Sequence, residues 1–156
     1  MTKEEFGGRV TALQSRLYRI ARGYLRSEHD CLDAVSEAVL KAWQKLATLR
    51  DDQLFEGWLV RILIRECVNI QRKQKRMVPV DAMPEQEQTQ PSNNEALRDA
   101  LDELPQAQRI VVVMHYMEGY NVEEIAAILH TFRGTITSRL HYARLKLREL
   151  LKEDIL

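Results

Sequence analysis

Residues 120–151, YNVEEIAAILHTFRGTITSRLHYARLKLRELL, decide the fold of the C-terminal part of this chain. Two separate helical periodicities run through the stretch, divided by a short segment at residues 130–132. The first predicts a helix over residues 122–129 that ends at His130, with two acids in its first turn, where the helix dipole favours anions. The second places an apolar residue at every third or fourth position, the pattern of a helix that buries one stripe. The residues of this stripe are Ile136, Leu140, Ala143, Leu147 and Leu150.

The second helix carries cationic and hydrogen-bonding residues outside its apolar stripe. No acid occurs between Thr131 and Arg148, and residues 133–148 have a net charge of +5. At roughly 1.5 Å per residue, about 17 residues form a helix about 25 Å long, which can enter a DNA major groove and continue past the backbone. An ordinary helical hairpin with a solvated basic face is the alternative interpretation. If the helix binds DNA, the expected contacts are Arg133, Thr135, Thr137, Ser138, Arg139, His141, Tyr142 and Arg144.

The formal net charge of the 156 residues is zero, but the charges are segregated. Residues 1–76 hold 15 Lys and Arg against 10 Asp and Glu, and residues 77–104 hold 1 against 7. This distribution predicts a basic domain followed by an acidic spacer. Because residues 77–94 contain three prolines and no apolar periodicity, we predict a flexible acidic linker there, between domains at residues 1–76 and 95–156.

Three amphipathic helices are predicted in the N-terminal domain, over residues 9–26, 30–46 and 58–76, with a loop at residues 47–56. Asp30 is the expected cap of the second helix. The predicted buried residues are Val10, Leu13, Leu17, Ile20, Ala21, Tyr24, Leu32, Val35, Val39, Ala42, Trp43, Leu46, Trp58, Leu59, Ile62, Leu63, Cys67 and Ile70.

Two of these helices also have distinctive outer faces. On the second helix, Asp33, Glu37 and Lys41 form a charged ridge. The third helix holds six cations and one acid from Gly57 to Arg76. A basic face with an aromatic residue suits nucleic acid. The residues left on this basic face are Arg61, Arg65, Asn69, Arg72, Lys73 and Arg76.

The C-terminal domain is predicted to begin with helices over residues 95–104 and 106–118. Pro105 fits the start of the second of these, where its missing amide costs little. The buried residues expected there are Ile110, Val111, Val113, Met114 and Met117. The predicted fold is therefore all-α, with two small helical domains.

Several classes of protein are disfavoured by what the sequence contains. Cys31 and Cys67 both lie in helical patterns, which indicates core thiols of a reduced, cytoplasmic protein. No apolar run is long enough to cross a membrane, so membrane insertion is not expected. The four histidines are scattered, and the chain has no phosphate-binding glycine loop, so we expect no metal, no cofactor and no enzymatic activity.

Three stretches of the sequence resemble regions of one protein family, and they follow one another in the same order as in that family. EIAAIL followed by GTITSRL resembles the GTV-x-SRL signature of region 4 in sigma factors, and LDELPQAQRIVVVMHYMEGYNVEEIA resembles the preceding region 4.1. DCLDAVSEAVLKAW followed by FEGWLVRILIRECVNIQRKQKR resembles region 2 of the extracytoplasmic-function (ECF) sigma factors. The resemblance extends from Leu17 to Leu151, which is nearly the whole chain.

The resemblance implies partners and roles for individual residues. It implies that core RNA polymerase binds the chain through the clamp helices of its largest subunit, which would dock on Asp33, Glu37 and Lys41. It implies promoter DNA as the second partner, and an anti-sigma factor is also expected because many members of the family are held by one. The family's base-contacting positions for the minus-35 element are occupied in this sequence by Thr137, Ser138, His141 and Tyr142. The residues implied near the opened minus-10 element are Arg50, Trp58, Arg61, Arg65, Asn69, Arg72 and Lys73.

The sequence departs from the family pattern at several positions. Ser36 replaces the usual glutamine, Arg65 a frequent asparagine, and Cys31 the usual alanine before the acidic pair. His130 stands where a turn glycine is usual. Phe132 replaces a frequent capping serine or proline, which makes Thr131 or Thr135 the expected cap of the second helix.

The sequence therefore predicts an ECF-type sigma factor that directs core polymerase to a two-part promoter. The alternatives are a helix-turn-helix regulator that binds an operator without entering polymerase, and a helical adaptor whose basic faces bind an acidic protein. The region 2 resemblance argues against both. A regulator would also usually need a dimer seam or a sensor domain, and the sequence has neither pattern.

Overall fold

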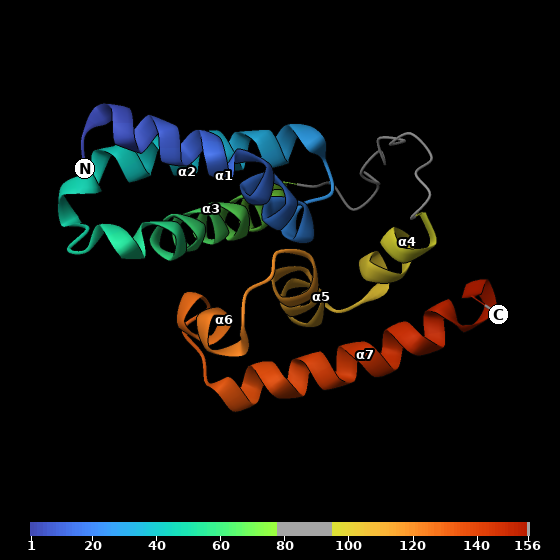
Figure 1. The fold of residues 1–156 in the computed structure, drawn as a ribbon. Coiled ribbons are helices and arrows are strands. Elements are labelled where there is room, and N and C mark those ends of the chain that lie inside the picture. Colours follow the sequence, from blue (N-terminus) through green and yellow to red (C-terminus); the bar gives the residue numbers. More distant parts are fainter. Residues whose placement is uncertain (78–94, 156) are drawn as a thin grey trace. The chain divides into compact units, whose positions relative to one another are not determined.

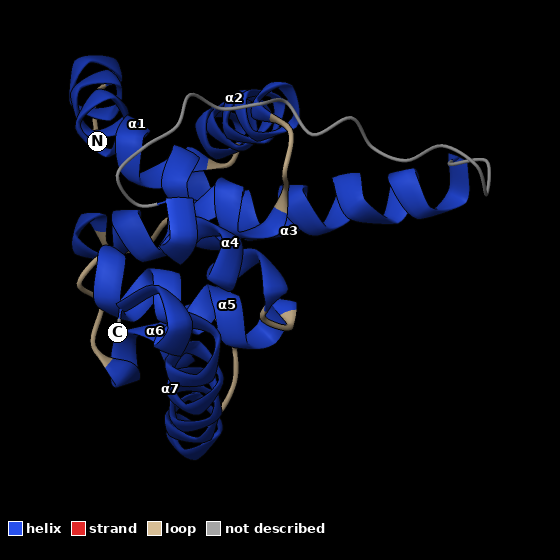
Figure 2. Cartoon of the chain, turned by 90° about the vertical axis from the view of Figure 1, so that its right-hand side faces the viewer, coloured by secondary structure: helices blue, strands red, loops and turns tan. Residues whose placement is uncertain are grey.

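The computed structural model describes residues 1–77 and 95–155, and every element in these residues is helical (Figures 1 and 2). The chain divides into two compact units, with the division between residues 87 and 88. The linker predicted over residues 77–94 lies outside the described residues except for Met77, which ends a helix.

The N-terminal unit consists of helices α1 (Lys3–Tyr24), α2 (Glu28–Gln44) and α3 (Phe55–Met77), which all pack against one another (Figure 1). Two short 3-10 helices, η1 (Leu46–Thr48) and η2 (Asp52–Leu54), occupy the segment between α2 and α3 that was predicted as a loop. Side chains from all three long helices form a fully buried core, which includes Leu17, Ile20, Cys31, Leu59, Leu63 and Cys67.

All three long helices begin before the positions predicted from periodicity, and α3 begins at Phe55 instead of Trp58. At Thr2 and Glu5 a reciprocal capping box starts α1, a signal that the T-x-x-E spacing carries. At the start of α2, the Ser27 side chain accepts a hydrogen bond from the Asp30 amide at 3.3 Å, so Ser27 and not Asp30 is the cap. The polar residues of both first turns hid these starts from a search for apolar spacing.

The buried face of α2 differs from the predicted face. Leu32 and Trp43 were predicted to be buried, but they are 51% and 44% exposed, while the buried residues include Cys31, Ala34 and Ala38. Small side chains let α1 and α3 approach α2 closely, so the interface selects this narrow stripe over the larger residues beside it. The other predicted core residues that are only half-buried are Leu13, Tyr24, Val39, Leu46, Trp58, Ile62 and Ile70.

The C-terminal unit consists of α4 (Glu95–Glu103), α5 (Gln106–Val112), the π-helix η3 (Val113–Met117), α6 (Val122–Ile128) and α7 (Arg133–Ile155). The long helix α7 packs against α4, α5 and α6 (Figure 1). Met117 was predicted to be buried but is exposed, because the π turn interrupts the α-helical spacing from which that prediction was made. Val112 is buried as well as Ile110, Val111, Val113 and Met114.

A tight turn joins α6 to α7. His130 has a φ of +53°, and the Thr131 amide donates to the Ala126 carbonyl at 3.0 Å, which closes the end of α6. Since α7 begins at Arg133, neither Thr131 nor Thr135 stands directly before the helix, and the predicted cap was wrong. The Phe132 carbonyl there accepts hydrogen bonds from the Thr135 and Ile136 amides.

Replacing His130 with glycine is expected to stabilise the C-terminal unit by about 0.5–1 kcal/mol, because glycine adopts a positive φ without the steric cost of a side chain. The exposed His130 side chain contributes little packing that could be lost. Thermal unfolding of the full chain measures the change. His130→Ala is the matched control and should not stabilise, since alanine keeps the Cβ; equal stabilisation by both variants would contradict the backbone explanation.

Candidate nucleic-acid interface

The two sides of α7 differ sharply in burial and chemistry. Ile136, Leu140 and Ala143 are buried against the rest of the C-terminal unit. The opposite side is exposed, and it presents hydroxyl, imidazole and phenol groups that can donate and accept hydrogen bonds. The exposed residues are Thr137, Ser138, His141 and Tyr142. Leu147 and Leu150, which were predicted to be buried, are half-buried.

The helix-turn-helix start is fixed by local hydrogen bonds. Asn121 caps α6, with its side chain accepting from the Glu124 amide at 2.8 Å and the Glu124 carboxylate accepting from the Asn121 amide at 3.0 Å. In the first turn of α7, the Thr137 hydroxyl donates to the Arg133 carbonyl at 3.1 Å. The Asn121 cap sets the beginning of α6, and α7 starts at the Phe132 carbonyl, which accepts from the Thr135 and Ile136 amides. The exposed residues of α7 therefore lie directly after the turn.

Two arginines of α7 contact groups on neighbouring elements. Arg133 Nε is 3.2 Å from Glu123 Oε1, an ion pair between α7 and α6. Arg144 Nη1 donates to the Tyr116 hydroxyl of η3 at 2.8 Å. Thr135 and Arg139 are half-buried. The residues predicted to contact DNA therefore include both exposed groups and groups already held by neighbouring elements.

In the N-terminal unit, the residues predicted to lie near opened DNA are unevenly exposed. Arg50, between η1 and η2, is exposed, and so are Arg65, Arg72 and Lys73 on α3. The other three predicted residues of α3, Trp58, Arg61 and Asn69, are half-buried.

The predicted charged ridge of α2 is only partly an outer surface. Asp33 and Glu37 are exposed, and Asp33 Oδ2 lies 3.3 Å from His29 Nε2. Lys41 instead donates to Glu66 Oε1 of α3 at 2.5 Å, and this hydrogen bond raises the pKa of Lys41. Sequence reasoning missed the role of Glu66, which is 7% exposed. A signal was present, since this acid lies among the apolar positions of an otherwise basic helix.

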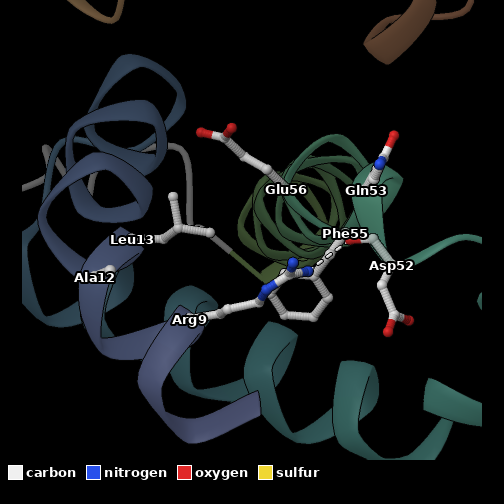
Figure 3. Close-up of a pocket in the computed structure, with 7 residues that line it drawn as sticks. All are labelled: Arg9, Ala12, Leu13, Asp52, Gln53, Phe55 and Glu56. Atoms are coloured by element: carbon white, nitrogen blue, oxygen red, sulfur yellow. Dashed lines mark hydrogen bonds between the residues drawn. The ribbon is translucent and has the colours of Figure 1, made fainter. Parts of the chain in front are cut away.

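A shallow pocket of about 300 Å³ lies between α1 and the start of α3 (Figure 3). Arg9 of α1 spans it: its Nη1 donates to the Asp52 carbonyl at 2.5 Å, and its Cζ lies 5.6 Å from the centre of the Phe55 ring. Arg16 also forms an ion pair with Glu56. These contacts attach the segment before α3 and the start of α3 to α1. The hydrogen bond from Arg9 and the ion pair of Arg16 join residues 43 and 40 positions apart, so no local pattern in the sequence indicates them.

The two cysteines are core thiols, as predicted. Burial is the main cause that raises the pKa of Cys31 to about 11 and the pKa of Cys67 to about 12. Both thiols are therefore protonated at neutral pH, which makes them weak nucleophiles. In residues 1–77 and 95–155, no group of three or more His, Cys, Asp and Glu side chains is arranged to hold a metal ion. None of the helices in these same ranges has the length and apolar character of a membrane span.

The chain matches known proteins over most of its length. The family model described as Sigma-70 region 2 matches residues 9–77, and that described as Sigma-70, region 4 matches residues 94–147. The RNA polymerase sigma factor SigV of Bacillus subtilis is 30% identical over 151 residues, which are 94% of this chain and 91% of that protein. The ECF RNA polymerase sigma factor SigM of Mycobacterium tuberculosis is 34% identical over 140 residues, 87% of this chain and 71% of that protein.

A solved structure gives the same result for the fold. The sigma factor RpoE from Bartonella quintana, in complex with the anti-sigma factor NepR, matches with a TM-score of 0.80 and 26% identity over 96% of this chain and 98% of that one. The chain therefore belongs to the sigma-70 family. Its relatives define it more narrowly as an ECF RNA polymerase sigma factor, a class of protein that directs polymerase without being an enzyme itself.

Proposed function

We propose that the two units divide promoter recognition between them. Residues 1–76 dock on core polymerase and contact the opened minus-10 element, residues 95–156 bind the minus-35 element, and residues 77–94 connect them. The observation that carries this proposal is that regions 2 and 4 match in one chain, each on a separate unit. A regulator that binds an operator without polymerase has no use for region 2, and this sets the main alternative aside.

In the N-terminal unit, the proposed minus-10 contacts combine cations with an aromatic ring. Exposed Arg65, Arg72 and Lys73 are suited to phosphates, and Arg50 lies in the segment before α3. Half-buried Trp58 has a ring that can stack on an unpaired base, an interaction that tolerates any base. The remaining residues proposed at this site are Arg61 and Asn69.

We propose that α2 is the docking surface for the clamp helices of the largest polymerase subunit. Asp33 and Glu37 supply exposed negative charge, and exposed Leu32 and Leu40 lie on the same helix. Charged groups beside apolar ones are typical of a protein interface, in which the charges select the partner and its orientation. Lys41 contributes less to this surface, because its ammonium group is hydrogen-bonded to Glu66.

The double variant Asp33→Lys/Glu37→Lys is expected to weaken core polymerase binding by about tenfold or more. The two new lysines would repel the positive groups of polymerase that the wild-type acids attract. Affinity for purified core polymerase measures the effect. Glu4→Lys/Glu103→Lys makes the same change of charge at two other exposed positions and should leave the affinity unchanged. If both double variants bound core polymerase like the wild type, α2 would not be the docking surface.

We further propose that an anti-sigma factor regulates this protein. We also propose that this protein acts in the cytoplasm, where RNA polymerase works. The support is the likeness to the sigma factor RpoE of Bartonella quintana, which was solved in complex with the anti-sigma factor NepR. The exposed apolar residues of α2 fit this proposal, since an inhibitor that covered them would also block polymerase docking.

Run-off transcription tests the proposed function directly. Purified core polymerase and a library of promoter DNA should yield specific transcripts only when this protein is added. Binding of the same DNA by the isolated chain is expected to be weak, because two small basic surfaces on a tether gain little from pre-organisation. Nanomolar, sequence-specific binding without polymerase, together with no transcript, would instead support an operator-binding regulator.

A further inference from the structure

The π-helix η3 places one exposed tyrosine against the DNA-facing helix. The segment Val113–Met117 closes with the Glu118 amide donating to the Val113 carbonyl at 3.0 Å and the Tyr120 amide donating to the Met114 carbonyl at 3.0 Å. Gly119 follows with a φ of +79°, a conformation that favours glycine. Single π turns of this kind often occur at functional sites.

Tyr116 joins this turn to α7. Its hydroxyl accepts the 2.8 Å hydrogen bond from Arg144 Nη1, a contact between residues 28 positions apart. The side chain is 53% exposed, so core packing does not account for a large aromatic residue there. The hydrogen bond to Arg144 is a specific contact that the hydroxyl makes on this surface.

A second set of contacts, made by His115, orients the Tyr116 ring. The His115 ring meets the Tyr116 ring edge to face, with centroids 4.9 Å apart and planes at 74°. His115 Nδ1 is 2.8 Å from the carbonyl oxygen of Tyr120, whose side chain is buried. The backbone of the turn thus orients His115, His115 packs on Tyr116, and Tyr116 holds the Arg144 guanidinium.

The contact of Arg144 with a phenol differs chemically from the contact that Arg133, also on α7, makes with a carboxylate. Arg133 pairs with the Glu123 carboxylate, which offsets its charge and competes with a phosphate. A neutral phenol leaves the charge of Arg144 intact and occupies one of five N–H donors, so the others stay available for a phosphate. Fixing a long side chain before binding also removes part of the entropy that would be lost on contact with DNA.

We propose that Tyr116 is a positioning residue for DNA binding, which holds the Arg144 guanidinium in the orientation that contacts a phosphate of the minus-35 element. This inference rests on the proposed binding of residues 95–156 to the minus-35 element, with Arg144 among the DNA contacts. It adds a residue outside the helix-turn-helix to the DNA-binding surface, and it gives the π turn a function: presenting the tyrosine hydroxyl to α7.

Promoter binding by the holoenzyme, measured over a range of salt concentrations, tests the inference. Tyr116→Phe keeps the ring contact with His115 and removes the hydroxyl, so Arg144 would have to be immobilised on binding. Binding to all promoter sequences should then weaken about two- to tenfold, the range for ordering one flexible side chain. The slope of affinity against salt should stay unchanged, because Arg144 still reaches its phosphate. Arg144→Ala should reduce that slope by about one. The double variant should bind like Arg144→Ala alone.

The controls separate failure of this inference from failure of the proposed function. Met117→Leu, at an exposed position of the same turn, should bind promoters like the wild type, and the thermal unfolding midpoint of Tyr116→Phe should be unchanged. If Arg144→Ala had no effect, the phosphate contact itself would be wrong. If Arg144→Ala weakened binding but Tyr116→Phe did not, the positioning role would be overturned. A further loss from Tyr116→Phe in the Arg144→Ala background would also overturn it, since Tyr116 would then contact DNA directly.

Discussion

Replacing Phe55 with alanine is expected to destabilise the N-terminal unit by about 3–5 kcal/mol, the usual cost of removing a large buried aromatic side chain. Phe55 is 2% exposed at the first position of α3. Its ring packs on Phe6 of α1 with a centroid distance of 5.7 Å and on Trp58 at 6.0 Å. Phe6 also contacts Trp43 of α2, at a centroid distance of 5.2 Å. The ring therefore lies in a cluster that connects all three helices.

The same substitution should loosen the segment before α3, because Arg9 lies over the Phe55 ring while it donates to the Asp52 carbonyl (Figure 3). Denaturant unfolding measures the stability, and hydrogen exchange of residues 47–56 measures the local effect. Leu54→Ala is the matched control at the preceding position, where the side chain is 63% exposed, and it should change stability by only about 0.5 kcal/mol. Equal losses from the two variants would show that the aromatic cluster does not stabilise this junction.

Substitutions on the exposed side of α7 should change which promoters are used. His141 and Ser138 present hydrogen-bonding groups to the surface on the side opposite Ile136 and Leu140, so we propose that they read base edges in the major groove. His141→Ala and Ser138→Ala should each change which bases are preferred, because each lost base contact removes about 1–3 kcal/mol of discrimination against the wrong base. Selection of promoter libraries by holoenzymes carrying each variant measures this preference.

Arg144→Ala is the contrasting variant in the same selection. A phosphate contact holds the protein in register without choosing a sequence, so its loss should weaken all promoters alike. The ranking of promoters should therefore stay as it is for the wild type. Were His141→Ala and Arg144→Ala both to lower output evenly on every promoter, with the preferred bases unchanged, the assignment of base-reading residues would be wrong.

The helix-turn-helix could be predicted from local sequence because its signals are themselves local. Ile136, Leu140 and Ala143 follow helical spacing on one long helix, and all three are buried. The turn was also predicted, because His130 stands where the family usually has a turn glycine. In the structure, His130 has the positive φ that favours glycine. Where two helices lie next to each other in the chain and bury regular stripes, periodicity alone identifies the faces.

Prediction was less successful where helix ends depend on polar residues or where a helix contacts two others. The capping box at Thr2 begins α1 ahead of any apolar pattern, and the π turn at Val113–Met117 breaks the spacing that placed Met117 in the core. On α2, several apolar stripes were available, and the choice of Ala34 and Ala38 over Leu32 follows from how closely α1 and α3 approach.

By itself, the sequence determined the class of this protein: an all-helical chain with regions 2 and 4 of a sigma factor, read from motifs whose residues are near neighbours in the chain. Only the tertiary structure decided which polar groups are held by partners. Lys41 donates to Glu66, 25 positions away, and Arg144 to Tyr116, 28 positions away. Such pairs carry no periodic signal, because they depend on the distance between helices that the packing of the core sets.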